Sequence, residues 1–148
     1  MISTFNELEA LALKQFVLSC VLPDRQQRFI TLMQSKKGLL KWLASLDHFQ
    51  NYLDTANAHD LSKKFNSQET TKEYALNVSS EVFVFSTFND MRGVKRRLGD
   101  AIAETFQMGN GSIICPLAST TFNGFYFGEE QFAQYLWMKK SFTGRTQQ

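Results

Sequence analysis

One polar segment in the middle of the chain has residue types and spacing suited to binding an anion. It combines two hydroxyls, an amide, a carboxylate and two guanidinium groups: Ser86, Thr87, Asn89, Asp90, Arg92 and Arg96. The segment follows the apolar run Val82–Phe85, which we expect to be a strand, and it begins what we expect to be a helix. Backbone N–H groups and the positive end of such a helix attract anions.

The two arginines strengthen this interpretation if the segment is helical. Arg92 and Arg96 are four residues apart, so they share one flank of the expected helix and can together hold a phosphate or a carboxylate. The alternative is that Asn89 or Asp90 only caps the helix while the basic side chains are solvated on its outer face. We therefore treat the segment as a candidate anion-binding or partner-binding site.

A second candidate lies in an aromatic stretch near the C-terminus. Asn123-Gly124 stands between aromatic and β-branched residues, which predicts a two-residue hairpin turn. The hairpin places Phe122, Phe125 and Phe127 on one face, where we expect them to pack in the core. Tyr126 falls on the opposite face. We expect Tyr126 to be exposed and available to a partner.

The histidines and cysteines raise two hypotheses about catalysis. His59-Asp60 resembles the His-Asp pair of the metal phosphohydrolases, and this resemblance implies a metal site with His48 as a further ligand. Two histidines near a polar loop are more often surface residues. Cys115 stands in an apolar run, where a thiol packs as a small hydrophobic side chain. We predict no catalytic residue, no metal and no cofactor.

The first part of the chain predicts a layer of about three helices, over residues 4–61. Within it, Ala10–Leu22 is apolar nearly all round, which predicts a helix buried on several sides. Pro23 is suited to the first turn of a second helix, and a third begins near Lys36. The pattern leaves open whether Gly38 separates two helices or lies within one.

The second part predicts a small mixed sheet. Val82–Phe85 is apolar on both faces, as in a central strand covered on each side. A helix over Met91–Phe106 that ends at Gly109, followed by a strand at Ser112–Cys115, completes a βαβ unit. A last helix begins at Gly128. Helices first and strands later indicate an α+β fold.

We therefore expect one domain over residues 1–148, with a sheet-containing half at about 80–140 and a frayed tail at 143–148. With 43% hydrophobic and 20% charged residues, the chain can bury a core, and much of that core should come from its 14 phenylalanines. Sixteen basic against 14 acidic residues leave a net charge of +2. This balance fits neither a general nucleic-acid binder nor an acidic mimic of nucleic acid.

The start of the sequence lacks the basic and apolar regions of a secretory signal, so we expect a cytoplasmic protein. No residues form a diagnostic catalytic set. The leading hypothesis is a non-enzymatic intracellular binding protein with a protein partner, of an accessory or toxin-neutralising type. The alternative is a small enzyme or ligand-binding domain for a phosphate- or carboxylate-bearing substrate at Ser86–Arg96. The partner's identity and the oligomeric state stay open.

Overall fold

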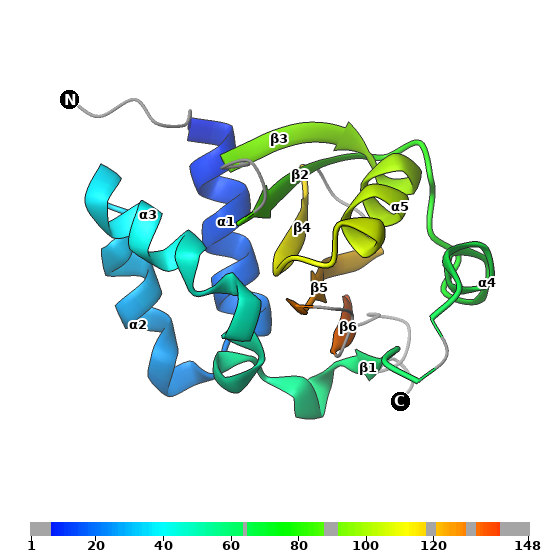
Figure 1. The fold of residues 1–148 in the computed structure, drawn as a ribbon, viewed down its shortest axis with the longest axis horizontal. Coiled ribbons are helices and arrows are strands. Elements are labelled where there is room, and N and C mark those ends of the chain that lie inside the picture. Colours follow the sequence, from blue (N-terminus) through cyan, green and yellow to red (C-terminus); the bar gives the residue numbers. More distant parts are fainter. Residues whose placement is uncertain (1–6, 64, 88–91, 118–120, 130–132, 140–148) are drawn as a thin grey trace, which may run out of the picture.

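The structure is a computed structural model that describes residues 7–63, 65–87, 92–117, 121–129 and 133–139, with Arg92 described by its backbone alone. The predicted tail at 143–148 lies outside these ranges. In the described part, a six-stranded sheet lies between two groups of helices (Figure 1), so the α+β class is confirmed.

The helices are α1 Glu7–Cys20, α2 Pro23–Leu32, α3 Lys36–Ala44, η1 Leu46–Tyr52, η2 Thr55–Asn57, α4 Ser67–Glu73 and α5 Leu98–Met108, with η denoting a 3₁₀ helix. The strands are β1 His59–Asp60, β2 Glu81–Ser86, β3 Arg92–Arg97, β4 Ser112–Pro116, β5 Phe122–Phe127 and β6 Gln134–Met138.

All neighbouring strands in the sheet are antiparallel, in the order β1-β6-β5-β4-β2-β3. The predicted mixed sheet with a βαβ unit is therefore wrong. The strands at Val82–Phe85 and Ser112–Cys115 do form, as parts of β2 and β4, but they pair with each other in opposite directions. The reason is an additional strand, β3, which reverses the chain before α5 carries it to β4.

The predicted helix over Met91–Phe106 is correct only in its second half. Residues 92–97 are β3, an edge strand in which Arg97 pairs with Glu81 and Val94 with Val84. By pairing with β2, this segment gives hydrogen-bond partners to backbone N–H and C=O groups of β2. A helix over the same residues would leave those groups of β2 without a partner. Lys and Arg side chains are common on such edges because they discourage pairing with another chain. Helix α5 begins only at Leu98 and ends at Met108, and the φ of 72° at the following Gly109 fits the predicted left-handed cap.

The aromatic segment is one continuous strand, so the predicted Asn123-Gly124 hairpin turn is wrong. The register between β5 and β6 shifts at Phe122/Gly124, which marks a bulge. Gly124 is required there because a Cβ would lie 2.6 Å from Cδ1 of Phe16. The predicted last helix from Gly128 is also wrong in its described part: Gln134–Met138 is β6, and it pairs along β5.

Both faces of the sheet are covered by apolar layers, which follow the alternation of side chains along each strand. Phe83 and Phe85 face α1, α2, α3 and η1, whereas Val82 and Val84 face α5. Helix α1 lies directly against β4 and β5 (Figure 1). As expected, phenylalanines supply much of this core, and eight of them are almost fully buried: Phe16, Phe29, Phe49, Phe83, Phe85, Phe122, Phe125 and Phe127.

The helices predicted for the first part of the chain form, although the predicted start at residue 4 lies outside the described residues, and α1 is less buried than expected. Ser35 accepts a hydrogen bond from the N–H of Gly38 at 3.0 Å, so Gly38 lies inside the first turn of α3 and the break precedes it. Helix α1 buries Phe16, yet Leu8 and Leu11 are 57% and 55% exposed. The prediction that this helix is buried on several sides is therefore wrong. Within the described ranges, no helix has the length and apolar character needed to cross a membrane.

Candidate functional site

The structure separates the residues of the predicted anion site along the β2–β3 hairpin. Ser86 ends β2, where Phe85 pairs with the backbone of Arg92, but Arg96 pairs with Val82 at the other end of the strand. Val82 and Ser86 are four positions apart along the strand, or roughly 13 Å. Where the chain is described again, the expected helix is not found, because Arg92–Arg97 is β3 and α5 begins at Leu98. The candidates Asn89 and Asp90 lie outside the described residues.

Ser86 and Thr87 line a pocket of about 260 Å³ beside α3, but their hydroxyls are used within the fold. Asp47 Oδ1 accepts hydrogen bonds from the N–H of Gly111 at 2.6 Å and from Thr87 Oγ1 at 3.2 Å. Ser86 Oγ donates to the carbonyl of Gly111 at 3.2 Å. These bonds attach η1 to the ends of β2 and β4, which gives the polar groups a structural role.

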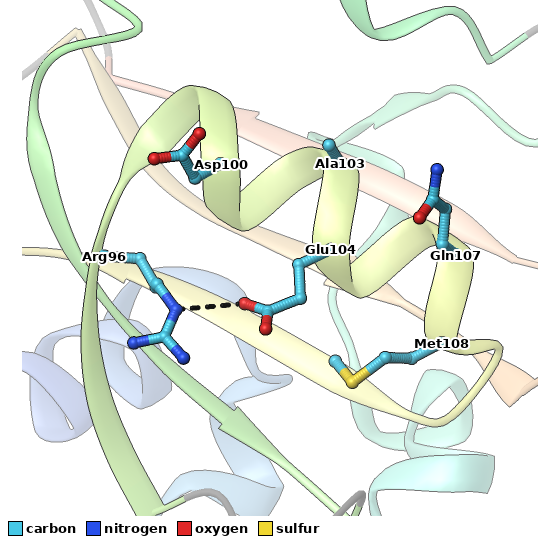
Figure 2. A pocket seen from close by; sticks show the side chains of 6 residues that line it. All are labelled: Arg96, Asp100, Ala103, Glu104, Gln107 and Met108. Carbon is cyan, nitrogen blue, oxygen red and sulfur yellow. Dashed lines mark hydrogen bonds and ion pairs between the residues drawn. The ribbon is translucent and has the colours of Figure 1, made fainter.

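Arg96 lines a different hollow, an open one of about 670 Å³ on the outer side of α5. Figure 2 shows its guanidinium directed at Glu104, with Asp100 and Gln107 on the same helix. Arg96 Nε donates to Glu104 Oε1 at 3.1 Å. This ion pair, with the nearby carboxylate of Asp100, removes most of the positive potential that an anion would need there.

Tyr126 is fully buried, so the prediction that it is exposed is wrong. It does lie on the opposite face from Phe125 and Phe127, but η1 covers that face as well. The Tyr126 hydroxyl donates to the carbonyl of Leu46 at 2.6 Å and accepts from the N–H of Phe49 at 3.2 Å. Burial raises the pKa of this phenol. Tyr126 therefore anchors η1 to the sheet.

Replacing Tyr126 by Phe tests this anchoring role. Tyr126→Phe keeps the ring but leaves the Leu46 carbonyl and the Phe49 N–H without their buried partner. We expect the free energy of unfolding to fall by about 2 kcal/mol, the usual effect of unpaired buried groups. Urea denaturation followed by circular dichroism measures the loss. As a control, Tyr74→Phe changes a half-buried tyrosine that is not part of this network and should have little effect. Unchanged stability of Tyr126→Phe would contradict the anchoring role.

The histidines lie at two separate places on the surface. His48 in η1 is 3.7 Å from Glu129, measured from Nε2 to Oε1, and its side chain is largely exposed. His59 in β1 lies against the ring of Tyr74, with centroids 4.7 Å apart. Among the described residues, no three His, Cys, Asp or Glu side chains are grouped so that they could hold a metal.

Both thiols, Cys20 and Cys115, are buried in the core, which raises the pKa of each. A thiolate nucleophile needs the opposite environment, one that lowers the thiol pKa. The raised pKa values have a consequence for stability. Below an unfolded thiol pKa of about 8.5 the protonated thiols stabilise the fold fully, and this contribution is lost as pH rises toward their folded pKa values.

We therefore expect stability to fall steeply in alkali. Each buried thiol lowers the free energy of unfolding by about 1.4 kcal/mol per pH unit above about pH 8.5, because only the unfolded state loses the proton. Urea denaturation between pH 7 and 10 measures this slope. Cys115→Ala should be less stable at pH 7 but should show a shallower decline, since one of the two titrating thiols is gone. An equal slope for both proteins would show that Cys115 does not retain its proton in the folded state.

The surface feature that the sequence did not indicate is a groove of about 570 Å³ between α1 and α2. Its walls include Leu8 and Leu11 from α1, Ile30 from α2 and Met33, which directly follows α2. Leu18, 45% exposed, continues the exposed leucines along α1 at helical spacing. In the sequence, the segment of α1 is apolar on nearly all sides. This pattern fits a helix that is buried on several sides as well as a helix with one exposed apolar side, so it did not reveal the groove.

Comparisons with models of protein families, with curated proteins and with solved structures each give no match for this chain. Of the surfaces described above, the groove between α1 and α2 has the most exposed large apolar side chains, those of Leu8 and Leu11. The hollows at Ser86 and Arg96 instead have polar groups that already bond to one another. Among these surfaces, the α1–α2 groove is therefore the most apolar.

Proposed function

We propose that the protein is a non-enzymatic binding protein of the cytoplasm that recognises a protein partner through the α1–α2 groove. The supporting observation is the exposure of Leu8 and Leu11, more than half of each side chain, on a well-formed helix. Single exposed leucines are ordinary, but adjacent ones lining a groove are typical of interaction sites. Covering them gains roughly 25 cal/mol per Å² of apolar surface.

The shape of the groove favours a helical partner. Helices α1 and α2 lie side by side, and the groove between them can accommodate the apolar stripe of a third helix. Leucines at positions 8, 11 and 18 offer contacts at the spacing with which helices pack against one another. The partner segment we propose is therefore an amphipathic helix.

The charge around the groove favours a partner with an acidic polar face. Helices α1 to α3 carry six basic residues and three acidic ones, although the net charge of the whole chain is only +2. Lys14 and Glu7 both line the groove itself, so the basic excess comes from beside it, where Lys36 and Lys37 follow shortly after Gln34 of the wall. Complementary charges speed association and set the orientation of the partner.

A designed peptide tests this function. The probe is a fluorescein-labelled helical peptide of about 16 residues, with leucines at i, i+3, i+7 and i+10 and glutamate and alanine elsewhere. We expect saturable binding by fluorescence anisotropy that weakens with salt. A peptide with lysine in place of glutamate should bind at least about tenfold more weakly. Equal binding of a scrambled peptide, which has the same composition without the apolar stripe, would contradict the proposal.

A further inference from the structure

Another pocket lies on the opposite side of α2 from the α1–α2 groove, between α2, α3 and η1. It is lined by basic and aromatic residues, whereas the groove is lined mainly by aliphatic ones. Its volume is about 280 Å³, and its walls include Arg28 and Phe29 from α2, Lys41 and Trp42 from α3, and Tyr52 from η1. We propose that this pocket binds a small organic acid, one that carries a carboxylate on a flat aromatic body. This inference is independent of the protein partner proposed above.

The first argument is the unbalanced charge of the pocket. Arg28 and Lys41 are exposed at their positions on the wall, and no carboxylate is among the described side chains that line it. Neither cation forms an ion pair with a described residue. The guanidinium of Arg25 lies 5.9 Å from the centroid of the Tyr52 ring, which adds a third cation beside the pocket. An anion is therefore attracted without competition from an internal partner.

The second argument is the aromatic lining. Phe29 is buried, and its ring centroid lies 5.8 Å from that of Trp42 and 5.3 Å from that of Tyr52. Ligand pockets usually combine apolar and aromatic walls with a few polar groups that orient the ligand. Of these three rings, that of the half-buried Tyr52 is the accessible one, and it favours a flat apolar body that can pack against it. An inorganic anion has no apolar surface and would make no such contact.

The third argument is an unpaired donor on a residue of the wall. The indole Nε1–H of Trp42 is buried and has no hydrogen-bond acceptor in the described part of the chain. The other tryptophan, Trp137, donates from Nε1 to the carbonyl of Asp54 at 3.1 Å. Trp42 also meets Phe49 edge to face, but a ring is a weaker acceptor than a carboxylate. Trp42 lines the pocket, and a carboxylate bound there that reaches this nitrogen would supply the missing acceptor, because buried donors without partners are unfavourable.

The two tryptophans make the inference testable by nuclear magnetic resonance. The probe is 2-naphthoate, with 2-naphthamide as its neutral counterpart. In ¹H–¹⁵N spectra of the uniformly labelled protein, we expect 2-naphthoate to move the indole resonance of Trp42 downfield while that of Trp137 stays in place. The variant Trp42→Phe assigns the resonance. The neutral amide should bind at least about tenfold more weakly.

Charge variants separate this site from a general affinity for aromatic compounds. Arg28→Gln combined with Lys41→Gln should weaken 2-naphthoate binding at least about tenfold and should weaken acidic-peptide binding less, because neither residue lines the α1–α2 groove. Lys72→Gln, on exposed α4, is the matched control and should bind 2-naphthoate as the wild type does. The inference is overturned if the Trp42 resonance does not move, if the amide binds equally well, or if the double variant binds as tightly as the wild type.

Discussion

Gly111→Ala is expected to lower the free energy of unfolding by about 3 kcal/mol, at the upper end of the usual cost of forcing an extra carbon into a packed site. A Cβ at position 111 would overlap the backbone of Leu46 and Asp47 at the start of η1. Backbone atoms cannot rotate away as a side chain can, so η1 would have to move from the sheet. That movement also strains the 2.6 Å hydrogen bond between the Gly111 N–H and Asp47 Oδ1.

Thermal and urea denaturation measure this loss. For a chain of this size, about 3 kcal/mol corresponds to a fall in Tm of roughly 6–12 °C. Gly99→Ala is the matched control, because its Cβ would lie 3.2 Å from the Val78 side chain, within the first turn of a helix that favours alanine. Its stability should change by less than about 1 kcal/mol. Wild-type stability of Gly111→Ala would contradict the close approach of η1 to β4.

The second large effect is expected on partner binding. Replacing both Leu8 and Leu11 by Gln removes the apolar side chains that line the α1–α2 groove. We expect affinity for the acidic amphipathic peptide to fall at least about a hundredfold, since central apolar anchors supply most of the binding energy of such sites. Stability should change by less than about 1 kcal/mol, because both side chains are already more than half exposed.

Leu40→Gln is the matched control for the double variant. Leu40 is also an exposed leucine on a helix, at 39%, but it lies on α3 and outside the groove. Its binding should equal that of the wild type in the anisotropy measurement. If the double variant binds as tightly as the wild type, the groove is not the binding surface. A large loss of stability would instead give the two leucines a structural role.

Local patterns predicted the elements that depend on neighbouring residues. The helices at Glu7–Cys20 and Pro23–Leu32 follow from apolar spacing and from Pro at a first turn. The strand at Val82–Phe85 follows from apolar residues on both faces. The cap at Gly109 follows from the readiness of glycine to adopt a positive φ.

The elements that were mispredicted depend on distant parts of the chain. Nothing within Arg92–Arg97 indicates a strand, because its pairing with β2 supplies the stabilisation. Gly124 looked like a turn residue, but its small size serves the approach of Phe16, which is more than one hundred residues away in sequence. In both cases tertiary packing overrides a local preference.

The exposure and the hydrogen-bond partners of the candidate site residues also depend on distant parts of the chain. Ser86 and Thr87 do line a pocket, but whether a hydroxyl is free depends on Asp47 and Gly111, which the sequence does not place beside them. Tyr126 was placed on the correct side of its strand, yet its burial depends on η1 lying over that side. Exposure and pairing of side chains follow from the assembled fold, and they could not be derived from spacing alone.

The most direct test of the proposed function is to map where the acidic amphipathic peptide binds. Backbone amide resonances of the ¹⁵N-labelled protein are followed as the unlabelled peptide is added. The proposal predicts that the perturbed amides lie within Leu8–Lys14 of α1 and within Ile30–Gln34, the last turn of α2 and the residues after it, because both segments contribute to the groove. Perturbations centred on Arg96 and Glu104, or no perturbation at saturating peptide, would contradict it.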